Sequence, residues 1–181
     1  MSAAERNPTT PHDDQPEPAP TLTVGRVVVY RSHGVGRVVE VQATTPRRPG
    51  FAVLELGDGL TVTLSLEQAG ALLRAPASED QLRAVQDILG ADAADDPGSW
   101  PTRLRAMQQK IAAGELTGLA EVTRDGIKDD RKRAGRAGST LPPSQRALYL
   151  KARRLLATEI AAVRDIDIEQ ADAWIDAQGN A

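Results

Sequence analysis

The chain of 181 residues contains no cysteine. It therefore has no disulfide framework, no thiolate nucleophile and no cysteine-based zinc site. This absence fits a reducing compartment, although many exported proteins also lack cysteine. Histidine is almost as scarce: His12 lies in a polar tail, and a lone His33 beside a glycine is more typical of a turn than of a metal site. We expect no metal and no other cofactor.

Long apolar runs are also missing. No run approaches the roughly 20 residues that a membrane span needs, and the N-terminus lacks the apolar stretch of a secretory signal. We therefore expect a soluble, cytoplasmic protein with no membrane partner.

Motifs of the common enzyme classes are not found. The sequence has no glycine-rich phosphate loop and no His-x-x-x-His pair, and its acidic residues cluster in linkers and tails. Ser32 and His33 are adjacent on a turn, so their side chains are not expected to converge on one substrate atom. The sequence predicts that the protein is not an enzyme.

The small net charge of −3 hides a strongly basic block. Residues 100–158 carry a net charge of +8, whereas residues 1–21, 22–99 and 159–181 carry −3, −3 and −5. A basic block between acidic ones is typical of a protein with a polyanionic partner such as nucleic acid. An arginine-rich helical surface without such a partner is the alternative interpretation.

The first half of the chain favours β-structure. Residues 1–21 are rich in proline and acidic residues, and we expect a disordered tail there. Short apolar runs at 27–30, 37–41, 51–56 and 60–66 predict four strands, and the glycines at 34 and 36 predict a hairpin between the first two. This spacing indicates a small antiparallel barrel over residues 22–74. Arg47 and Arg48 lie between two prolines in a loop, and we expect them to be exposed cations. The alternative interpretation is loop charge that is simply solvated and has no binding role.

Residues 75–181 are predicted to be helical, so the fold class is α+β. Ser78 and Gln81 form a capping box that opens a helix ending near Gly90. Further helices are expected at 101–114, from 116 through Gly126, at 142–163 and after 166. Inside its helix Gly126 should cost about 1 kcal/mol relative to alanine. The basic segment 128–138 is expected to be a fraying helix end followed by a loop.

Trp100 is unusual because only five residues of the chain are aromatic. It follows the polar loop 96–99 and precedes Arg103 and Arg105. One interpretation is a tryptophan at a helix start that packs against a neighbouring helix. The other is an apolar wedge or stacking platform for nucleobases, with the arginines on phosphates.

Several of these segments together resemble the CarD/CdnL family of bacterial transcription regulators, and the first half is also similar to the polymerase-binding module of the transcription-repair coupling factor. The resemblance runs from about residue 22 to 176 and depends on the order and spacing of the motifs. Its main elements are Val24-Gly25, His33-Gly34-Val35-Gly36, Asp58-Gly59-Leu60-Thr61-Val62, Trp100, Ala113-Gly114-Glu115-Leu116, Ala120-Glu121-Val122-Thr123-Arg124-Asp125 and Lys151-Ala152-Arg153.

The resemblance implies a Tudor-like barrel that docks on the β subunit of RNA polymerase, with an exposed strand extending a partner sheet. It implies that Thr44 and Thr63 occupy positions where family members carry polymerase-facing arginines, with Arg47 and Arg48 as nearby substitutes. The helical domain would lie on promoter DNA at the upstream edge of the melted region. Trp100 would enter the minor groove there, and the basic DNA-facing positions would be Arg103, Arg105 and Arg146.

These expectations lead to one main hypothesis, a monomeric regulator that binds polymerase and stabilises the open promoter complex. The alternative is a protein-interaction adaptor that uses the edge of the β-barrel and has no DNA role. A stand-alone DNA binder is less favoured, because the charge of +8 is spread over residues 100–158.

Overall fold

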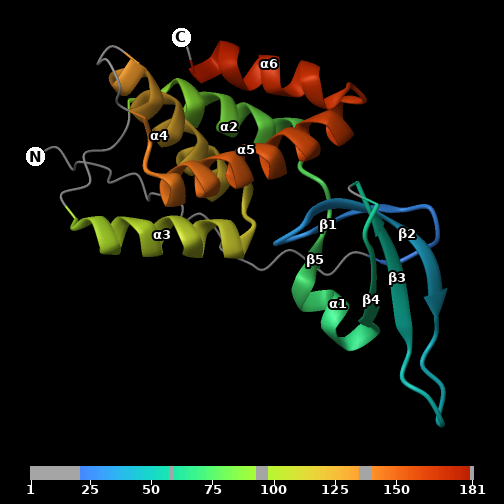
Figure 1. Ribbon diagram of the computed structural model, residues 1–181. Helices are drawn as coiled ribbons and strands as arrows, with labels where there is room; N and C mark the ends of the chain where they lie inside the picture. Colours follow the sequence, from blue (N-terminus) through green and yellow to red (C-terminus); the bar gives the residue numbers. More distant parts are fainter. Residues whose placement is uncertain (1–20, 58, 93–97, 135–139, 180–181) are drawn as a thin grey trace, which may run out of the picture.

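The computed structural model describes residues 21–57, 59–92, 98–134 and 140–179. An antiparallel sheet forms one end of the molecule and a group of helices forms the other (Figure 1). The sheet module comprises β1 (Val27–Tyr30), β2 (Gly34–Gln42), β3 (Phe51–Leu56), β4 (Thr61–Ser65), α1 (Leu66–Leu72) and β5 (Leu73–Arg74). The helical module comprises α2 (Glu79–Gly90), α3 (Trp100–Ala113), α4 (Leu116–Ala134), α5 (Pro143–Arg164) and α6 (Ile168–Gly179). The expected tail, apart from Thr21, and residues 96 and 97 of the polar loop before Trp100 lie outside the described residues.

The predicted hairpin is confirmed and lies at the centre of the sheet. β1 pairs antiparallel with β2, and Tyr30 is opposite Gly34. The His33 amide donates to the Tyr30 carbonyl at 2.8 Å, and Gly34 has the positive φ, 89°, that the reversal needs. Farther along β2 the register shifts between Val38 and Glu40, so this strand bends as it crosses the sheet.

The sheet has the strand order β4-β3-β2-β1-β5 and curls into a half-barrel. The α+β class is confirmed, but the sheet contains a fifth strand and a helix that the sequence did not predict. α1 begins where the Ser65 side chain accepts a hydrogen bond from the Gln68 amide. After α1, the two residues of β5 return the chain to the free side of β1. Such a short strand has no periodicity to detect, because pairing with β1 alone defines it.

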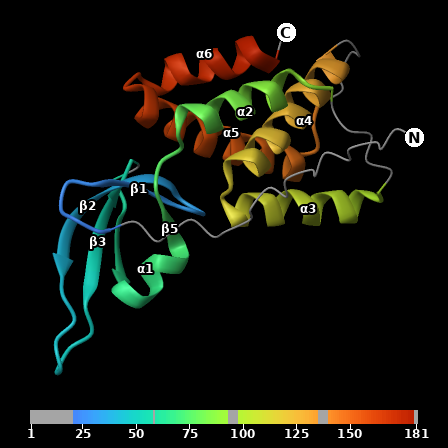
Figure 2. The same ribbon diagram turned by 180° about the vertical axis from the view of Figure 1, so that it is seen from behind.

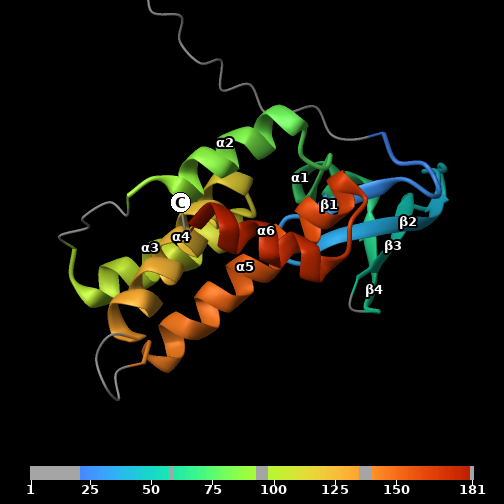
Figure 3. The same cartoon turned by 90° about the horizontal axis from the view of Figure 1, so that it is seen from above.

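Each module has its own apolar core. The smaller core lies inside the curled sheet and consists of Val28, Val38, Leu54, Leu64, Ala69 and Leu73. The larger core lies among the helices and includes Leu82, Val85, Leu89, Leu119, Leu156, Ile160, Ala171 and Ile175. Seen from above, α2 and α5 flank α6, and each of them contacts it (Figure 3). No helix in the described part of the chain combines the length and the apolar character that crossing a membrane would require.

The capping box of α2 is confirmed. The Ser78 side chain accepts from the Gln81 amide, and the Gln81 side chain accepts from the Ser78 amide. Both bonds satisfy amides that the first helical turn leaves without partners. The helix ends at Gly90, as expected.

Two expectations for α4 were wrong. The helix continues to Ala134, so the first part of the basic segment is helical rather than a frayed end; residues 135–139 lie outside the described residues. Gly126 is also not a defect of the helix. It is buried, and a Cβ atom placed on it would lie 2.1 Å from the Tyr149 ring of α5. The missing side chain is therefore what allows α4 and α5 to approach so closely.

The chain passes from the sheet module to the helical module where it leaves β5 for α2 (Figure 2). A buried ion pair joins the two modules at this point. Arg74 of β5 donates to both carboxylate oxygens of Glu159 on α5, at 2.5 and 2.7 Å. Glu159 also accepts from the Ala77 amide at 3.0 Å, and Arg74 donates to the Gly114 carbonyl at 3.0 Å. The Glu159 side chain is only 1% exposed. We call this group of hydrogen bonds the junction clasp.

Candidate functional site

Trp100 is the first residue of α3, and it is partly exposed to solvent. Its exposed fraction is 36%, and it belongs to the small set of large apolar residues left at the surface of the described chain. Ser99 before it makes no side-chain cap bond to the helix; its hydroxyl instead pairs with that of Thr102 at 2.9 Å. The start of α3 therefore presents an indole together with amide groups that the helix itself does not use.

The other tryptophan has a different environment. Trp174 of α6 is partly buried against the helical core. The Arg164 guanidinium lies 4.5 Å from the centre of its ring, in the position of a cation–π contact. The comparison shows that this fold packs a tryptophan against its core where a neighbouring helix provides a surface. The exposure of Trp100 is thus a local feature of the start of α3.

The three predicted DNA-facing arginines are exposed, but they do not share one face. Arg103 lies three positions after Trp100 on α3, which places the two on neighbouring parts of the helix surface. Arg105 lies five positions after Trp100, so it is turned to another side of α3. Arg146 is in the first turn of α5, a different helix. The structure therefore offers several cations around the helical module rather than a single stripe beside the indole.

Ion pairs neutralise part of the basic block. Lys110 pairs with Glu121 at 2.7 Å, and Lys128 pairs with Asp92 at 3.4 Å. Arg153 donates to Asp172 and Asp176 of α6, and these hydrogen bonds raise the pKa of Arg153 above its ordinary value. Arg153 is therefore a structural link between α5 and α6. Among the described residues of the block, no ion pair or side-chain hydrogen bond holds Arg105, Lys132, Arg146, Lys151 or Arg154.

The expected polymerase-facing residues are at the far end of the sheet module. Arg47 and Arg48 are exposed in a turn closed by the Thr45–Arg48 bridge, and the β2–β3 connection projects away from the helices (Figure 1). Thr44 is also exposed, but its hydroxyl accepts from the Gly50 amide at 3.0 Å. It therefore helps to shape the loop.

Thr63 lies on β4, which forms one edge of the sheet. The Leu56 amide donates to the Leu60 carbonyl at 2.9 Å. From this pair the antiparallel ladder alternates: Leu54–Val62 is a hydrogen-bonded pair and Val53–Thr63 is not. The amide and carbonyl of Thr63 therefore point away from β3, toward the open side of the sheet. An extended segment of another protein can pair with such an edge.

The described residues contain no group of three or more histidine, cysteine, aspartate or glutamate side chains arranged to hold a metal ion.

The side chains of Ser32 and His33 contact each other, with 2.7 Å between Oγ and Nδ1. The His33 ring also stacks on Tyr30, with ring centres 4.6 Å apart. The pair belongs to the exposed hairpin turn.

These features define a two-module binding protein, in which one module offers a main-chain edge and the other an indole and free cations. Two family models match the chain. The CarD-like/TRCF RID domain matches residues 22–75, and the CarD C-terminal domain matches residues 84–176. The chain therefore belongs to the CarD/CdnL family, a non-catalytic family of transcription regulators that interact with RNA polymerase.

Sequence reasoning missed the junction clasp, although one signal for it was present. On α5, Glu159 lies between Leu156 and Ile160 and interrupts the apolar positions of the helix. Both Leu156 and Ile160 are fully buried. A carboxylate at such a position is expected to be buried too, and a buried carboxylate needs a cationic partner. The partner, Arg74, could not be identified, because it lies 85 residues earlier in the chain.

Proposed function

We propose that the protein binds the β subunit of RNA polymerase through its sheet module and stabilises the open promoter complex through DNA contacts of its helical module. The observation that carries this proposal is the partly exposed indole of Trp100 at the start of α3, within the segment that matches the CarD C-terminal domain. The protein would act as a monomer and would reach the nucleoid through polymerase.

The attachment to polymerase would use the open edge of β4. The outward amide and carbonyl of Thr63 can pair with a strand of the β subunit, and Arg47 and Arg48 can contact acidic groups beyond the end of β3. Main-chain pairing explains how binding would persist although Thr44 and Thr63 occupy positions where family members carry arginine. Side chains at these positions would adjust the affinity rather than create it.

The DNA contacts would form at the upstream edge of the melted region. Trp100 would enter the minor groove as a wedge, and Arg103, Arg105 and Arg146 would contact phosphates on either side. A contact made only in the open complex shifts the closed-to-open equilibrium by its own free energy. A wedge with a few phosphate contacts can supply about 1–3 kcal/mol, which corresponds to roughly fivefold to 150-fold in this equilibrium. Whether transcription rises or falls would depend on the slow step of each promoter.

The junction clasp supports the proposal, because a wedge is effective only at a fixed distance from its anchor. Arg74 belongs to the polymerase-binding module, and Glu159 belongs to the DNA-binding module. Their hydrogen bonds, together with those to Ala77 and Gly114, hold β5 against α5. Binding of the sheet to polymerase would therefore determine where Trp100 meets the DNA.

The test is the lifetime of the open complex formed by polymerase on a promoter. Trp100→Ala should bind polymerase as tightly as the wild-type protein and should lose most of the increase in lifetime. Ile168→Ala is the matched control, because it removes another exposed apolar side chain from the helical module. An unchanged lifetime with Trp100→Ala would refute the wedge.

The adaptor hypothesis keeps the β4 edge and removes the DNA contacts. The exposed edge favours it as a second candidate, because that edge is independent of Trp100. The salt dependence of binding distinguishes the two hypotheses. Each phosphate contact makes the binding of promoter DNA by the polymerase complex more salt-dependent, by about one unit in the slope of log K against log salt concentration. If Arg105→Gln and Arg146→Gln leave that slope unchanged, the adaptor is the better description.

A further inference from the structure

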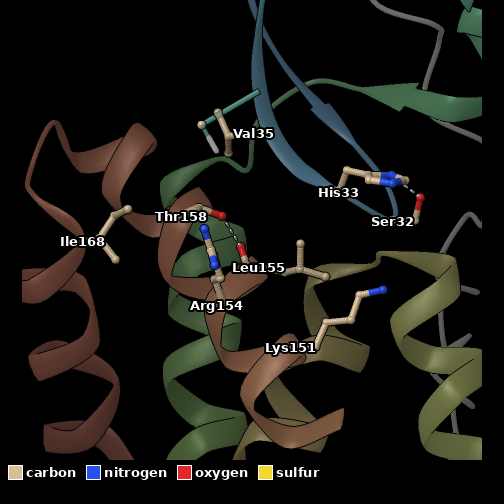
Figure 4. A pocket seen from close by; sticks show the side chains of 9 residues that line it. Ser32, His33, Val35, Lys151, Arg154, Leu155, Thr158 and Ile168 are labelled. Carbon is tan, nitrogen blue, oxygen red and sulfur yellow. Dashed lines mark hydrogen bonds between the residues drawn. The ribbon is translucent and has the colours of Figure 1, made fainter. Parts of the chain in front are cut away.

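A cavity of about 390 Å³ lies between the two modules. One wall is the turn between β1 and β2, and the other is the middle of α5, from Lys151 to Thr158 (Figure 4). Its lining consists of Ser32, His33, Val35, Gly57, Lys151, Arg154, Leu155, Thr158 and Ile168. None of the residues that we propose for polymerase or DNA binding belongs to this lining.

The cavity carries two unneutralised positive charges. Lys151 and Arg154 lie three positions apart on α5; the Lys151 side chain extends toward the β1–β2 turn, and the Arg154 side chain extends past Thr158 toward Val35 (Figure 4). Neither has an ion pair or side-chain hydrogen bond among the described residues, whereas Arg153 between them is turned to Asp172 and Asp176. The described residues that line the cavity contribute no carboxylate. An anion entering it would therefore meet positive charge without a competing negative one.

The opposite wall provides a further donor. Ser32 and His33 are paired through Oγ and Nδ1. If the hydroxyl donates, the Nε2–H of the imidazole is free, and if Nδ1–H donates, the hydroxyl proton is free. In either arrangement, one donor of the pair remains for a ligand. Thr158 adds no proton of its own, because its hydroxyl donates to the Leu155 carbonyl at 2.9 Å.

We propose that this cavity binds a small organic phosphate, with the phosphate group on Lys151 and Arg154 and an apolar body against Val35, Leu155 and Ile168. A phosphate monoester carries close to two negative charges near neutral pH, which matches the two cations, whereas a carboxylate would leave one cation uncompensated. Arginine also forms paired hydrogen bonds with phosphate oxygens. This inference goes beyond the proposed function, and its test does not require polymerase.

Such a ligand would touch both modules at once. It would connect the β1–β2 turn to α5 on a face of the junction where the described side chains that line the cavity form no ion pair. A molecule that binds only the folded state stabilises it by mass action, to an extent set by its concentration relative to its Kd. Occupancy of the cavity would therefore strengthen the contact between the polymerase-binding and DNA-binding modules.

The test is a titration of the ¹⁵N-labelled full chain with phenyl phosphate in a phosphate-free buffer, followed by amide NMR shifts. We expect saturable shifts at Val35, Gly57 and Thr158. Inorganic phosphate, which lacks an apolar body, and phenol, which lacks the anion, should each bind more weakly. The variant Lys151→Gln/Arg154→Gln should lose about tenfold or more in affinity.

The matched control is Arg47→Gln/Arg48→Gln, which removes the same charge from an exposed turn outside the cavity and should bind phenyl phosphate as the wild type does. The amide spectrum of each variant reports its fold, and all four substituted side chains are exposed. The proposal is overturned if the shifts do not saturate, if the Lys151/Arg154 variant binds equally well, or if inorganic phosphate binds as tightly as phenyl phosphate. It is also overturned if only a DNA duplex shifts these amides, because Lys151 and Arg154 would then be DNA contacts.

Discussion

The two modules expose different chemistry. The sheet module presents main-chain groups along β4, where the amide and carbonyl of Thr63 point outward. The helical module presents side chains, above all Trp100, Arg105 of α3 and the unpaired cations Arg146, Lys151 and Arg154 of α5. Recognition by main chain tolerates many side-chain replacements, whereas recognition by an indole depends on one residue. We therefore expect the sheet module to accept substitution at its proposed binding surface more readily than the helical module does.

The largest effect should come from breaking the junction clasp that joins the two modules. Glu159→Ala leaves the Arg74 guanidinium, which is only 13% exposed, without its carboxylate. Removing one partner of a buried pair costs about 3–5 kcal/mol. We expect a loss of this size in the free energy of unfolding, measured by urea denaturation.

The matched control for the clasp is Glu121→Ala, which breaks the exposed pair with Lys110. That change should cost less than about 1 kcal/mol. The double variant Arg74→Met/Glu159→Leu should recover much of the stability lost by Glu159→Ala, because no unpaired charge remains buried. Equal effects of Glu159→Ala and Glu121→Ala would mean that the clasp is not a major link between the modules.

The next effect concerns the packing of α4 against α5. Gly126→Ala places a methyl group against the Tyr149 ring and should destabilise the protein by about 1–3 kcal/mol. Helix propensity alone predicts the opposite, a gain of about 1 kcal/mol. Gly118→Ala in the same helix is the control: its Cβ would lie 3.3 Å from the Lys110 Cβ, a tight contact that a shift of a few tenths of an ångström relieves, so the change should be far less destabilising than Gly126→Ala. Thermal denaturation distinguishes the two, and a stabilised Gly126→Ala protein would contradict the close approach of these helices.

A third prediction separates main-chain from side-chain recognition in the sheet module. Thr63→Pro removes an outward amide that makes no bond to β3, so the sheet should persist, while binding to the polymerase β subunit should fall about tenfold. Thr63→Val keeps the amide and should bind nearly as the wild type does. A pull-down with titrated β subunit measures both. If valine weakens binding as much as proline does, the threonine side chain, not the edge, makes the contact.

A smaller effect should distinguish the two tryptophans. With Trp174→Phe the remaining indole is Trp100, which is 36% exposed, so its emission should lie at long wavelength and be quenched readily by acrylamide. With Trp100→Phe the remaining indole packs under Arg164, and quenching should be slower. Fluorescence of the free protein measures this difference. Equal quenching constants would mean that Trp100 is covered in solution.

The smallest effect concerns pH. The hydrogen bond from Arg153 holds the pKa of Asp176 below its ordinary value. A carboxylate with a depressed pKa in the folded state stabilises the protein above its unfolded pKa, and this contribution disappears as the pH falls through the folded pKa. Asp176→Asn should therefore flatten the loss of stability below about pH 4. Denaturation midpoints of the two proteins between pH 3 and 7 would show it, and parallel curves would contradict a role for this pair.

Local signals in the sequence were enough for much of the fold. The hairpin at Gly34, the capping box at Ser78 and the helix that begins at Pro143 each depend on a few adjacent residues, and all were predicted. β5 and α1 were missed, because two strand residues and one short helical run have no distinct pattern of their own. The roles of Trp100 and of the arginines around it stay predictions, since they depend on partners outside the chain.

The sequence by itself determined that this protein has a β-rich first part and a helical second part with a basic block. Those properties follow from residue order, backbone propensity and charge, which need no distant neighbour. Only the tertiary structure decided which charged side chains form ion pairs and which stay unpaired. Arg153 and Arg154 are adjacent in the chain, yet one is bound to two aspartates and the other lines an open cavity, because consecutive side chains on a helix point about 100° apart.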